Sequence, residues 1–296
     1  NLTAIGDDTA AGDIQISGPG TLEVFAGRNL DLGIGGNNAD GTGTGINSIG
    51  NARNPFLPFE GADIIAGAGI GEAWSLDTSR ADFPAFIARF ITGKTGKDHL
   101  KEAGLTPSQF EALDSEARRQ IALRIFYFVL RDAGRDHNDP DSPGFGNYDA
   151  GKEAVALLFP EEEGKTNWQG DLQTRARDIR TKNGGDITLF APGGGVALAT
   201  SVIGSPLAPP GIITESGGHI NLFTDGNVDL GISRIFTLRG GNEIIWSSRG
   251  DIAAGSSSKT VQSAPPTRVL IDPQSADVKT DLAGLATGGG IGVLST

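Results

Sequence analysis

Cysteine and methionine are both absent from this chain of 296 residues. Without cysteine the protein has no disulfide bonds and no thiolate chemistry, which fits an exported protein that does not depend on oxidative folding. No apolar run approaches the ~18 residues that a membrane-spanning helix needs, so we expect no membrane insertion. A chain without methionine lacks an initiating residue, and we therefore expect a processed product or a piece of a longer protein.

Basic residues are also scarce. The chain has 24 Lys and Arg against 36 Asp and Glu, which gives a formal net charge of −12 and a pI near 4.7. Nucleic acids and anionic membrane surfaces attract proteins of the opposite charge. We therefore expect an acidic, water-exposed surface and no nucleic-acid partner.

Glycine is abundant, with 45 residues, about twice the usual share. Many of these glycines stand before a small polar residue and a short run of alternating apolar side chains, as in GDITLF from Gly185 and GHINLF from Gly218. Alternation with a period of two predicts strands with one buried face. Strands this short must stack on further copies of the same motif to bury a core. The motif also begins at Gly12, Gly20, Gly226 and Gly250.

The spacing of these motifs predicts the fold. His219 and Asn242 each precede such a strand and lie 23 residues apart, a length typical of one coil of a parallel β-helix. A β-sandwich would need hairpin turns and strands of more equal length. We predict a mainly β fold, a right-handed parallel β-helix (a solenoid) with an inserted α-helical subdomain. The expected domains are coils with a glycine-rich excursion at 1–78, a helical insertion at 79–165, further coils at 166–255, and an extended C-terminal tail or cap at 256–296.

Apolar residues adopt helical spacing in the expected insertion. Phe83, Phe86 and Phe90 fall on one face of a short helix. A further helix with many apolar residues follows, and these helices have each other and the coil surface to pack against. The side chains that they must bury are Phe86, Phe90, Phe126 and Leu130.

Local signals predict where the helices begin and end. Thr106 and Gln109 fit a capping box, and Asp114 fits a second N-cap. The long helix after Asp114 is expected to stop at Gly134. A last helix is expected over about 152–159 and ends before a proline.

Three strings carry a resemblance to a known family: SRIFTLRGG (233–241), IWSSRGDIAAGSSSKTVQSAPPTRVLIDP (245–273) and DLAGLATGGGIGVL (281–294). They look like the C-terminal region of large exoproteins of the filamentous haemagglutinin family, and ALRIFYFVLRDAGR (122–135) resembles the insertion in that region. The resemblance implies a right-handed β-helical fibre that is secreted across the outer membrane by a two-partner system. It also implies an adhesin that acts in host attachment, biofilm or cell–cell contact. It implies no catalytic or ligand-binding residues.

One acidic string is a candidate cation site. DHNDPD places four oxygen-bearing side chains within six residues: Asp136, Asn138, Asp139 and Asp141. Such ligands suit a hard cation such as Ca²⁺. The EF-hand pattern fails, because a proline interrupts the string and Asn147 stands where a glutamate is needed. The competing interpretation is an acidic surface loop after the long helix. We predict no other cofactor and no catalytic residue.

Arg249, Gly250 and Asp251 form a tripeptide that integrins recognise. Gly-Asp also precedes strands elsewhere in this chain without an arginine, for example at Asp186. Asp is therefore a habitual residue at the start of these strands. Turn geometry is the favoured interpretation of the tripeptide.

Parallel β-helices also include polysaccharide lyases and hydrolases, whose chemistry needs carboxylates gathered in one cleft. Asp186 with Asp171, or Asp229 with Asp225, are pairs that could align on neighbouring coils, as any such pair could in a stack. His219 occupies the same position before its strand as Asp186, so we interpret it as a turn residue.

Tryptophans are few, and Trp74, Trp168 and Trp246 could stack on sugar rings. Trp246 stands where Phe190 and Phe223 stand in other strands, so a buried aromatic column inside the coils is favoured instead. Trp74 and Trp168 flank the helical insertion and are expected to hold it against the coils.

The resemblance, together with the predicted solenoid, implies a structural and binding module of a secreted adhesin on the outer surface of a Gram-negative bacterium. The expected partners are host or bacterial surface glycans or proteins, copies of the chain itself, and an outer-membrane secretion partner for the full-length precursor. Two alternatives are a subunit of a self-assembling extracellular filament and a polysaccharide-degrading lyase or hydrolase. The tail after Ser256 is expected to cover strand edges at the end of the stack.

Overall fold

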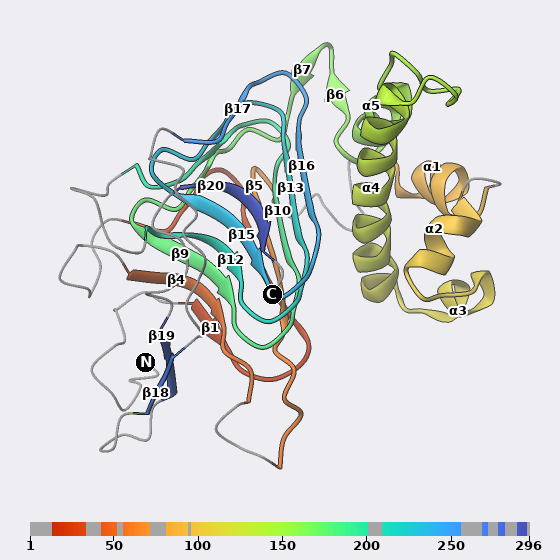
Figure 1. The fold of residues 1–296 in the computed structure, drawn as a ribbon. Coiled ribbons are helices and arrows are strands. Elements are labelled where there is room, and N and C mark those ends of the chain that lie inside the picture. The colour runs from red at the N-terminus through yellow and green to blue at the C-terminus, as the bar shows by residue number, and fades with distance from the viewer. Residues whose placement is uncertain are drawn as a thin grey trace.

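Three parallel β-sheets form the body of the protein in a computed structural model (Figure 1). The structure describes residues 14–33, 43–51, 56–71, 81–93, 96–200, 209–255, 268–271, 278–281 and 289–294. Every strand pair within these three sheets is parallel.

Each sheet is built from strands that are far apart in the sequence. Sheet A contains, in spatial order, β1 (Ile14–Ile16), β4 (Gly43–Ser48), β9 (Arg177–Thr181), β12 (Gly211–Thr214), β15 (Arg234–Leu238) and β20 (Gly290–Leu294). Sheet B contains β2 (Thr21–Ala26), β5 (Asp63–Ala68), β10 (Ile187–Ala191), β13 (Ile220–Thr224) and β16 (Glu243–Ser247). Sheet C contains β3 (Leu30–Asp31), β8 (Leu172–Gln173), β11 (Val196–Ala197), β14 (Val228–Asp229) and β17 (Ile252–Ala253).

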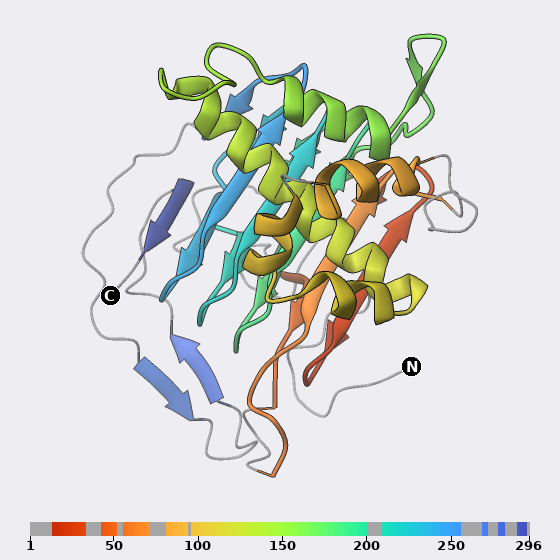
Figure 2. The same ribbon diagram turned by 90° about the vertical axis from the view of Figure 1, so that its right-hand side faces the viewer.

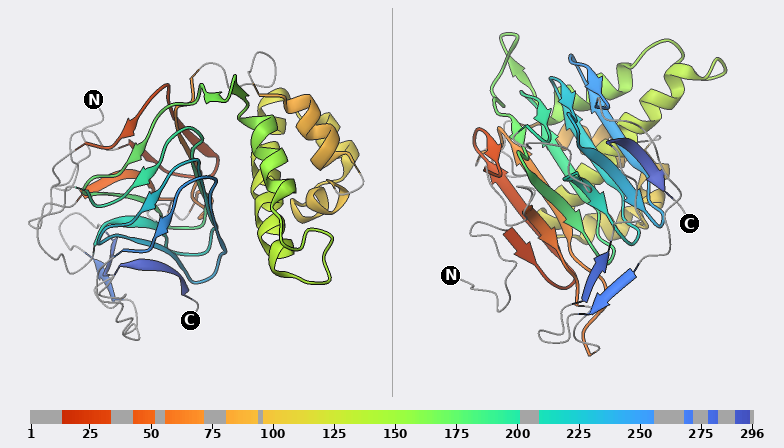
Figure 3. Two further views of the ribbon diagram at one scale, coloured as in Figure 1. Left: turned by 90° about the horizontal axis from the view of Figure 1, so that it is seen from above. Right: turned by 60° about the vertical axis from the view of Figure 1, so that its left-hand side comes forward.

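The chain visits the three sheets in a fixed order, A then B then C, and then returns to sheet A one strand farther along. Over the described residues five coils are complete, and β20 adds the first strand of a sixth; Figure 3 shows the coils from above. In sheet B, Ile220 pairs with Glu243, which is the 23-residue spacing expected from the sequence. The prediction of a mainly β, parallel β-helix is confirmed.

Apolar side chains form columns inside the coils. In sheet A, Ile46, Ile179, Ile212 and Ile235 are aligned by strand pairing and have no exposed surface. Similar columns from sheets B and C meet them in one core. Because neighbouring strands are about 4.8 Å apart, each side chain stacks on an equivalent one, and every added coil buries apolar surface on both of its faces.

Glycines at the corners between sheets A and B allow this close stacking. Gly185, Gly218 and Gly241 have φ angles of +88°, +94° and +109°. A Cβ atom at Gly218 would lie 2.3 Å from the backbone oxygen of Gly185, and one at Gly241 would lie 2.0 Å from that of Gly218. Only glycine fits such a position, because both the positive φ and the neighbouring coil reject a side chain.

The helices lie between β5 and β8 in the sequence, within the second coil. They are α1 (Phe83–Phe86), the π-helix η1 (Ile87–Ile91), α2 (Gly96–Glu102), α3 (Pro107–Ala112), α4 (Ser115–Asn138) and α5 (Asp149–Leu158), followed by a hairpin of β6 (Glu161–Glu162) and β7 (Lys165–Thr166). The capping box at Thr106 and the N-cap at Asp114 are confirmed. The end expected at Gly134 is wrong, because α4 continues to Asn138. A Cβ at Gly134 would meet no atom within 4 Å, so this residue lies in the helix without a structural demand for glycine.

Helices α4 and α5 cover the outer face of sheet B (Figure 2). Phe190, Phe223 and Trp246 are aligned on this face by strand pairing. Phe126 of α4 contacts Phe223 edge to face, with 5.2 Å between ring centroids. The aromatic column expected inside the coils is therefore real but lies outside them. Both faces of sheet B are buried at β10 and β13, and the smaller aliphatic side chains lie on the inner face.

The chain after β17 contributes two further features. Strands β18 (Arg268–Ile271) and β19 (Val278–Asp281) form an antiparallel hairpin. Strand β20 then pairs with β15, so the tail does cover the edge of sheet A, as expected. None of the described helices has the length and apolar character needed to cross a membrane.

The corner glycines generate a stability prediction. Substitution Gly218→Ala should destabilise the protein by about 3 kcal/mol or more, because it combines backbone strain with a clash against Gly185. Gly27→Ala is the matched control, since a Cβ at Gly27 meets no atom within 4 Å. Urea unfolding followed by circular dichroism measures both. Equal effects of the two substitutions would contradict this role of the corner glycines.

Candidate functional site

Polar side chains stack at the corner between sheets A and B and link successive coils. The backbone N–H of Asp186 donates to Asp63 Oδ1, and that of His219 donates to Asp186 Oδ1, both at 2.8 Å. The backbone N–H of Asn242 then donates to His219 Nδ1 at 2.9 Å. Each side chain therefore accepts the N–H of the same corner position in the next coil. This contact confirms the interpretation of His219 as a turn residue equivalent to Asp186.

A small polar cavity lies beside this corner, where α4 crosses sheet B. Asp63, Asp186, Arg124 and Asn221 are among the residues that line its volume of about 80 Å³. Burial raises the pKa of Asp63, and the Arg124 guanidinium lies 3.8 Å from Asp186. Binding pockets for organic ligands usually have about 300–1,000 Å³. The cavity has room for a few water molecules but not for a sugar ring.

The carboxylate pairs considered from the sequence have other partners. Asp171 lies at the corner between sheets B and C, away from Asp186, and accepts the N–H of Gly195 at 2.9 Å. Asp229 accepts the N–H of Gly231, also at 2.9 Å. Asp171 therefore binds the backbone of the next coil, and Asp229 binds the backbone of its own turn. The structure does not bring Asp171 and Asp186 together.

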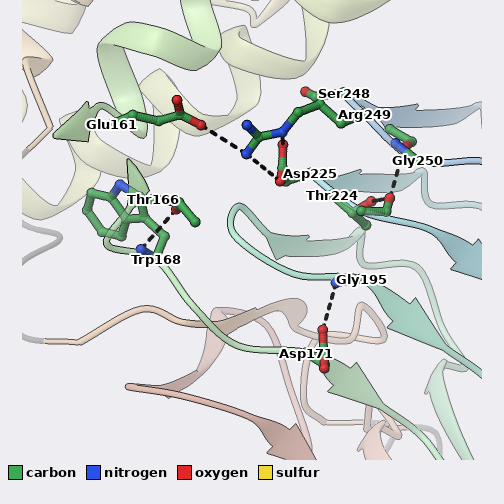
Figure 4. A network of polar contacts seen from close by, with 12 residues as sticks. Glu161, Thr166, Trp168, Asp171, Gly195, Thr224, Asp225, Ser248, Arg249 and Gly250 are labelled. Carbon is green, nitrogen blue, oxygen red and sulfur yellow. Dashed lines mark hydrogen bonds and ion pairs between the residues drawn. The ribbon is translucent and has the colours of Figure 1, made fainter. Parts of the chain in front are cut away.

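Arg249 connects the coils to the β6–β7 hairpin (Figure 4). Its guanidinium binds both oxygens of Asp225, at 2.7 Å each, and Glu161 at 2.9 Å. The backbone N–H of Asp251 donates to Asn227 Oδ1 at 2.8 Å, which repeats the corner pattern of the other coils. The arginine of the Arg-Gly-Asp tripeptide is therefore engaged within the protein. This geometry agrees with the turn interpretation.

The four candidate calcium ligands lie at the C-terminal end of α4. Asn138 Nδ2 donates to the Gly134 carbonyl, and Asp139 Oδ1 accepts the N–H of Asp141. Asp136 contributes its carbonyl oxygen to the N–H of Asp139. Over the described residues, no group of three or more His, Asp and Glu side chains is placed to hold a metal ion. Calcium binding by Asp136, Asn138, Asp139 and Asp141 stays a prediction.

A shallow depression of about 680 Å³ adjoins this string. Its lining residues include Arg131, Arg135, Asn138 and Asp139. Arg131 is paired with Glu102 and Asp132, and the exposed Arg135 lies 3.9 Å from the same Asp132 carboxylate. The depression therefore presents positive and negative groups together on the surface of the helical insertion.

The tryptophans hold the helices against the coils. Trp168 is buried, donates its indole N–H to the Pro160 carbonyl at 3.1 Å, and contacts Phe159 edge to face. Trp246 is half-buried and contacts Tyr148 at 5.5 Å between ring centroids. The anchoring role expected of Trp168 is confirmed. Trp74 lies outside the described residues.

Sequence reasoning missed an ion network on the outer face of sheet A. The Arg180 guanidinium binds Asp178 at 2.6 Å and Glu215 at 3.0 Å. Alternating charges in the β9 string RDIRT are the signal that could have revealed it. The network links β9 to the turn after β12 and leaves no carboxylate of this group available for a ligand.

Sequence reasoning also missed Glu243. Strand pairing aligns this residue with Leu22, Ile64, Ile187 and Ile220, a column that faces the core. Its carboxylate accepts the backbone N–H of Thr237 at 3.0 Å. Burial raises the pKa of Glu243 to about 7, and the Thr237 hydrogen bond opposes this only in part. A carboxyl group thus stands where four other coils place an aliphatic side chain.

The raised pKa makes stability depend on pH. The folded protein holds a proton on Glu243 that the unfolded chain releases near pH 4.5, so this group's contribution to stability decreases as pH rises from about 4.5 to about 7. Glu243→Gln should therefore stabilise the protein at pH 8 by about 1 to 2 kcal/mol, allowing for partial solvent exposure, and have little effect at pH 4. Urea unfolding at both pH values measures the difference. A benefit of equal size at pH 4 would contradict the assignment.

Comparison with known proteins adds one finding. Residues 240–296 match the model of a family described as filamentous haemagglutinin family outer membrane protein. No curated protein and no solved structure matches the chain. The matched segment includes β16, β17, the β18–β19 hairpin and β20, which together end the β-helix. The resemblance inferred from the sequence is therefore confirmed for this C-terminal segment, which is similar to filamentous haemagglutinin family outer membrane proteins.

Proposed function

We propose that this chain is a structural and binding module of a secreted, surface-displayed adhesin of the filamentous haemagglutinin type. The observation that carries the proposal is the combination of a parallel β-helix with the family match over the coil that ends it. The proposed location is the outer surface of a Gram-negative bacterium, and the proposed roles are attachment, biofilm formation and cell–cell contact.

In this proposal the β-helix acts as a stiff support that holds a contact surface in place. Hydrogen bonds between successive coils run along the axis of the stack, and the core columns continue through all five complete coils. Such a solenoid is stiff along its axis and presents whatever is inserted into its loops. The helical insertion is the largest such element, and its aromatic contacts with sheet B fix its position.

The proposed contact surface lies on this insertion. Phe145 has 55% of its surface exposed, and Tyr148 is partly exposed beside Trp246. Exposed aromatic side chains next to polar groups favour surface recognition. The partners that we propose are surface glycans or proteins of a host or of other bacteria. For the longer precursor we propose an outer-membrane secretion partner.

An adhesion assay tests the proposal. Fluorescent beads coated with the chain should be retained on epithelial or bacterial cells at least tenfold more than albumin-coated beads, and soluble chain should compete. Phe145→Ser should lower retention severalfold, because it removes the most exposed aromatic group of the insertion. Leu57→Ser, which changes an exposed apolar residue between β4 and β5, is the matched control.

Two outcomes would argue against an adhesin. Retention equal to that of albumin on all cells would remove the binding role. Depolymerisation of a polysaccharide by the purified chain would favour the lyase or hydrolase alternative instead.

A further inference from the structure

The C-terminal end of the β-helix is an open cross-section of its core. Within the described residues, β16 and β17 are the last strands of sheets B and C, whereas sheet A continues by one strand to β20. Ile252 and Ile291 end two interior columns of apolar side chains, and 45% and 37% of their surfaces are exposed. Unpaired strand edges beside exposed apolar side chains are a template for further β pairing.

A second copy of this chain carries the matching surface. In the first described coil of that copy, the same columns begin with Leu22 in sheet B and Leu30 in sheet C. Both side chains pack against the core. Within the described residues β2 is the outermost strand of sheet B at that end, and it is parallel to the strands that lead to β16. If two copies stacked head to tail, each sheet of one copy would continue into the same sheet of the other with its strands still parallel. This is the association that the fold favours.

Glu243 interrupts this match. It faces the core in the last strand of sheet B, directly where Leu22 of an incoming copy would have to pack. Covering Glu243 with an apolar coil would bury its carboxyl group further, with the Thr237 N–H as its hydrogen-bond donor. Above pH 7 the group is charged, and burying a charge without a counter-charge is strongly unfavourable. Inward-facing charges on edge strands are a known device against edge-to-edge pairing.

Strand β20 is a second obstacle to the stacking of copies. It occupies the edge of β15 that β1 of an incoming copy would need in order to bring β2 against β16. With β20 in place, the incoming coil is held one strand spacing, about 4.8 Å, farther away. Its β2 and β3 then lie beyond hydrogen-bonding distance of β16 and β17.

We propose that Glu243 and β20 together close the C-terminal end of the β-helix against a second copy of this chain. The two devices act differently, since one makes burial of the end face costly and the other displaces the incoming strands. The described columns of the first coil carry no inward-facing charge. This inference does not depend on the adhesin proposal.

Engineered cysteines report stacking directly, because the chain contains no native cysteine. Thr21 and Asn242 occupy the same corner column at opposite ends of sheet B. Within one copy they are four strand spacings apart, about 19 Å, which is too far for a disulfide. Thr21→Cys with Asn242→Cys can therefore cross-link only between copies stacked head to tail. Each single cysteine variant is a control.

The full chain carrying both cysteines should stay monomeric under mild oxidation. Adding Glu243→Ile and removing residues 289–296 should raise the yield of cross-linked multimers at least tenfold and produce longer rods in electron micrographs. Glu243→Ile alone should leave the chain without cross-links, because β20 still holds the two cysteines about two strand spacings apart. Glu111→Ile, which makes the same change on the exposed surface of α3, should have no effect.

The outcomes decide the proposal in each case. The proposal is overturned if the chain with only the two cysteines cross-links as readily as the chain that also carries Glu243→Ile and lacks residues 289–296. It is also overturned if that altered chain folds natively and stays monomeric. If the truncated chain does not fold, Gly290→Pro replaces the truncation in the full-length chain, because it removes the N–H that β20 donates to the Ser233 carbonyl. An equal onset of cross-linking with and without Glu243→Ile in that background refutes the role of Glu243. Because no cell adhesion is measured, these results are separate from those that test the adhesin proposal.

Discussion

The contact between a corner glycine and the backbone of the coil before it sets the geometry of the whole protein. Gly185, Gly218 and Gly241 let successive corners approach so closely that a side chain at any of them would strike a carbonyl oxygen. This approach places the strands of each sheet within hydrogen-bonding distance and aligns the apolar columns inside. It also aligns Asp63, Asp186 and His219, whose side chains bind the N–H of the next coil. Glycine at these corners is thus a direct requirement of stacking at one strand spacing per coil.

The helical insertion uses the surface that this stacking creates. Sheet B offers a flat outer face on which Phe190, Phe223 and Trp246 lie in one line, and α4 and α5 pack across it. Tyr127 completes the contact, since its buried hydroxyl donates to the Leu189 carbonyl at 2.8 Å. Arg249 and Glu161 tie the following hairpin to the coils. An element that leaves the stack for about a hundred residues is therefore held rigidly, which is what display of a contact surface requires.

Local signals in the sequence were sufficient for the period of the fold and for several helix starts. The 23-residue spacing between His219 and Asn242 and the N-caps at Thr106 and Asp114 depend only on nearby residues. Features that depend on distant packing could not be predicted. Alternation in β13 shows which residues share a face but not that Phe223 lies under a helix, because both faces of that sheet are buried. The Arg249–Glu161 pair and the inward direction of Glu243 likewise follow from pairing between coils. The helix end predicted at Gly134 was wrong because the sequence does not distinguish a glycine that ends a helix from one that no neighbouring atom requires.

The central claim is that successive coils pair in parallel at a fixed register, and a disulfide between two of them tests it most directly. Asp229 and Ala253 are aligned partners on the exposed face of sheet C. Cysteines at these two positions should form an intramolecular disulfide in high yield, because aligned neighbours on adjacent strands meet its distance requirement. Cysteines at Asp229 and Ile252, shifted by one residue toward the core face, should not. Equal yields for the two pairs, or a preference for the shifted pair, would contradict the stacked β-helix.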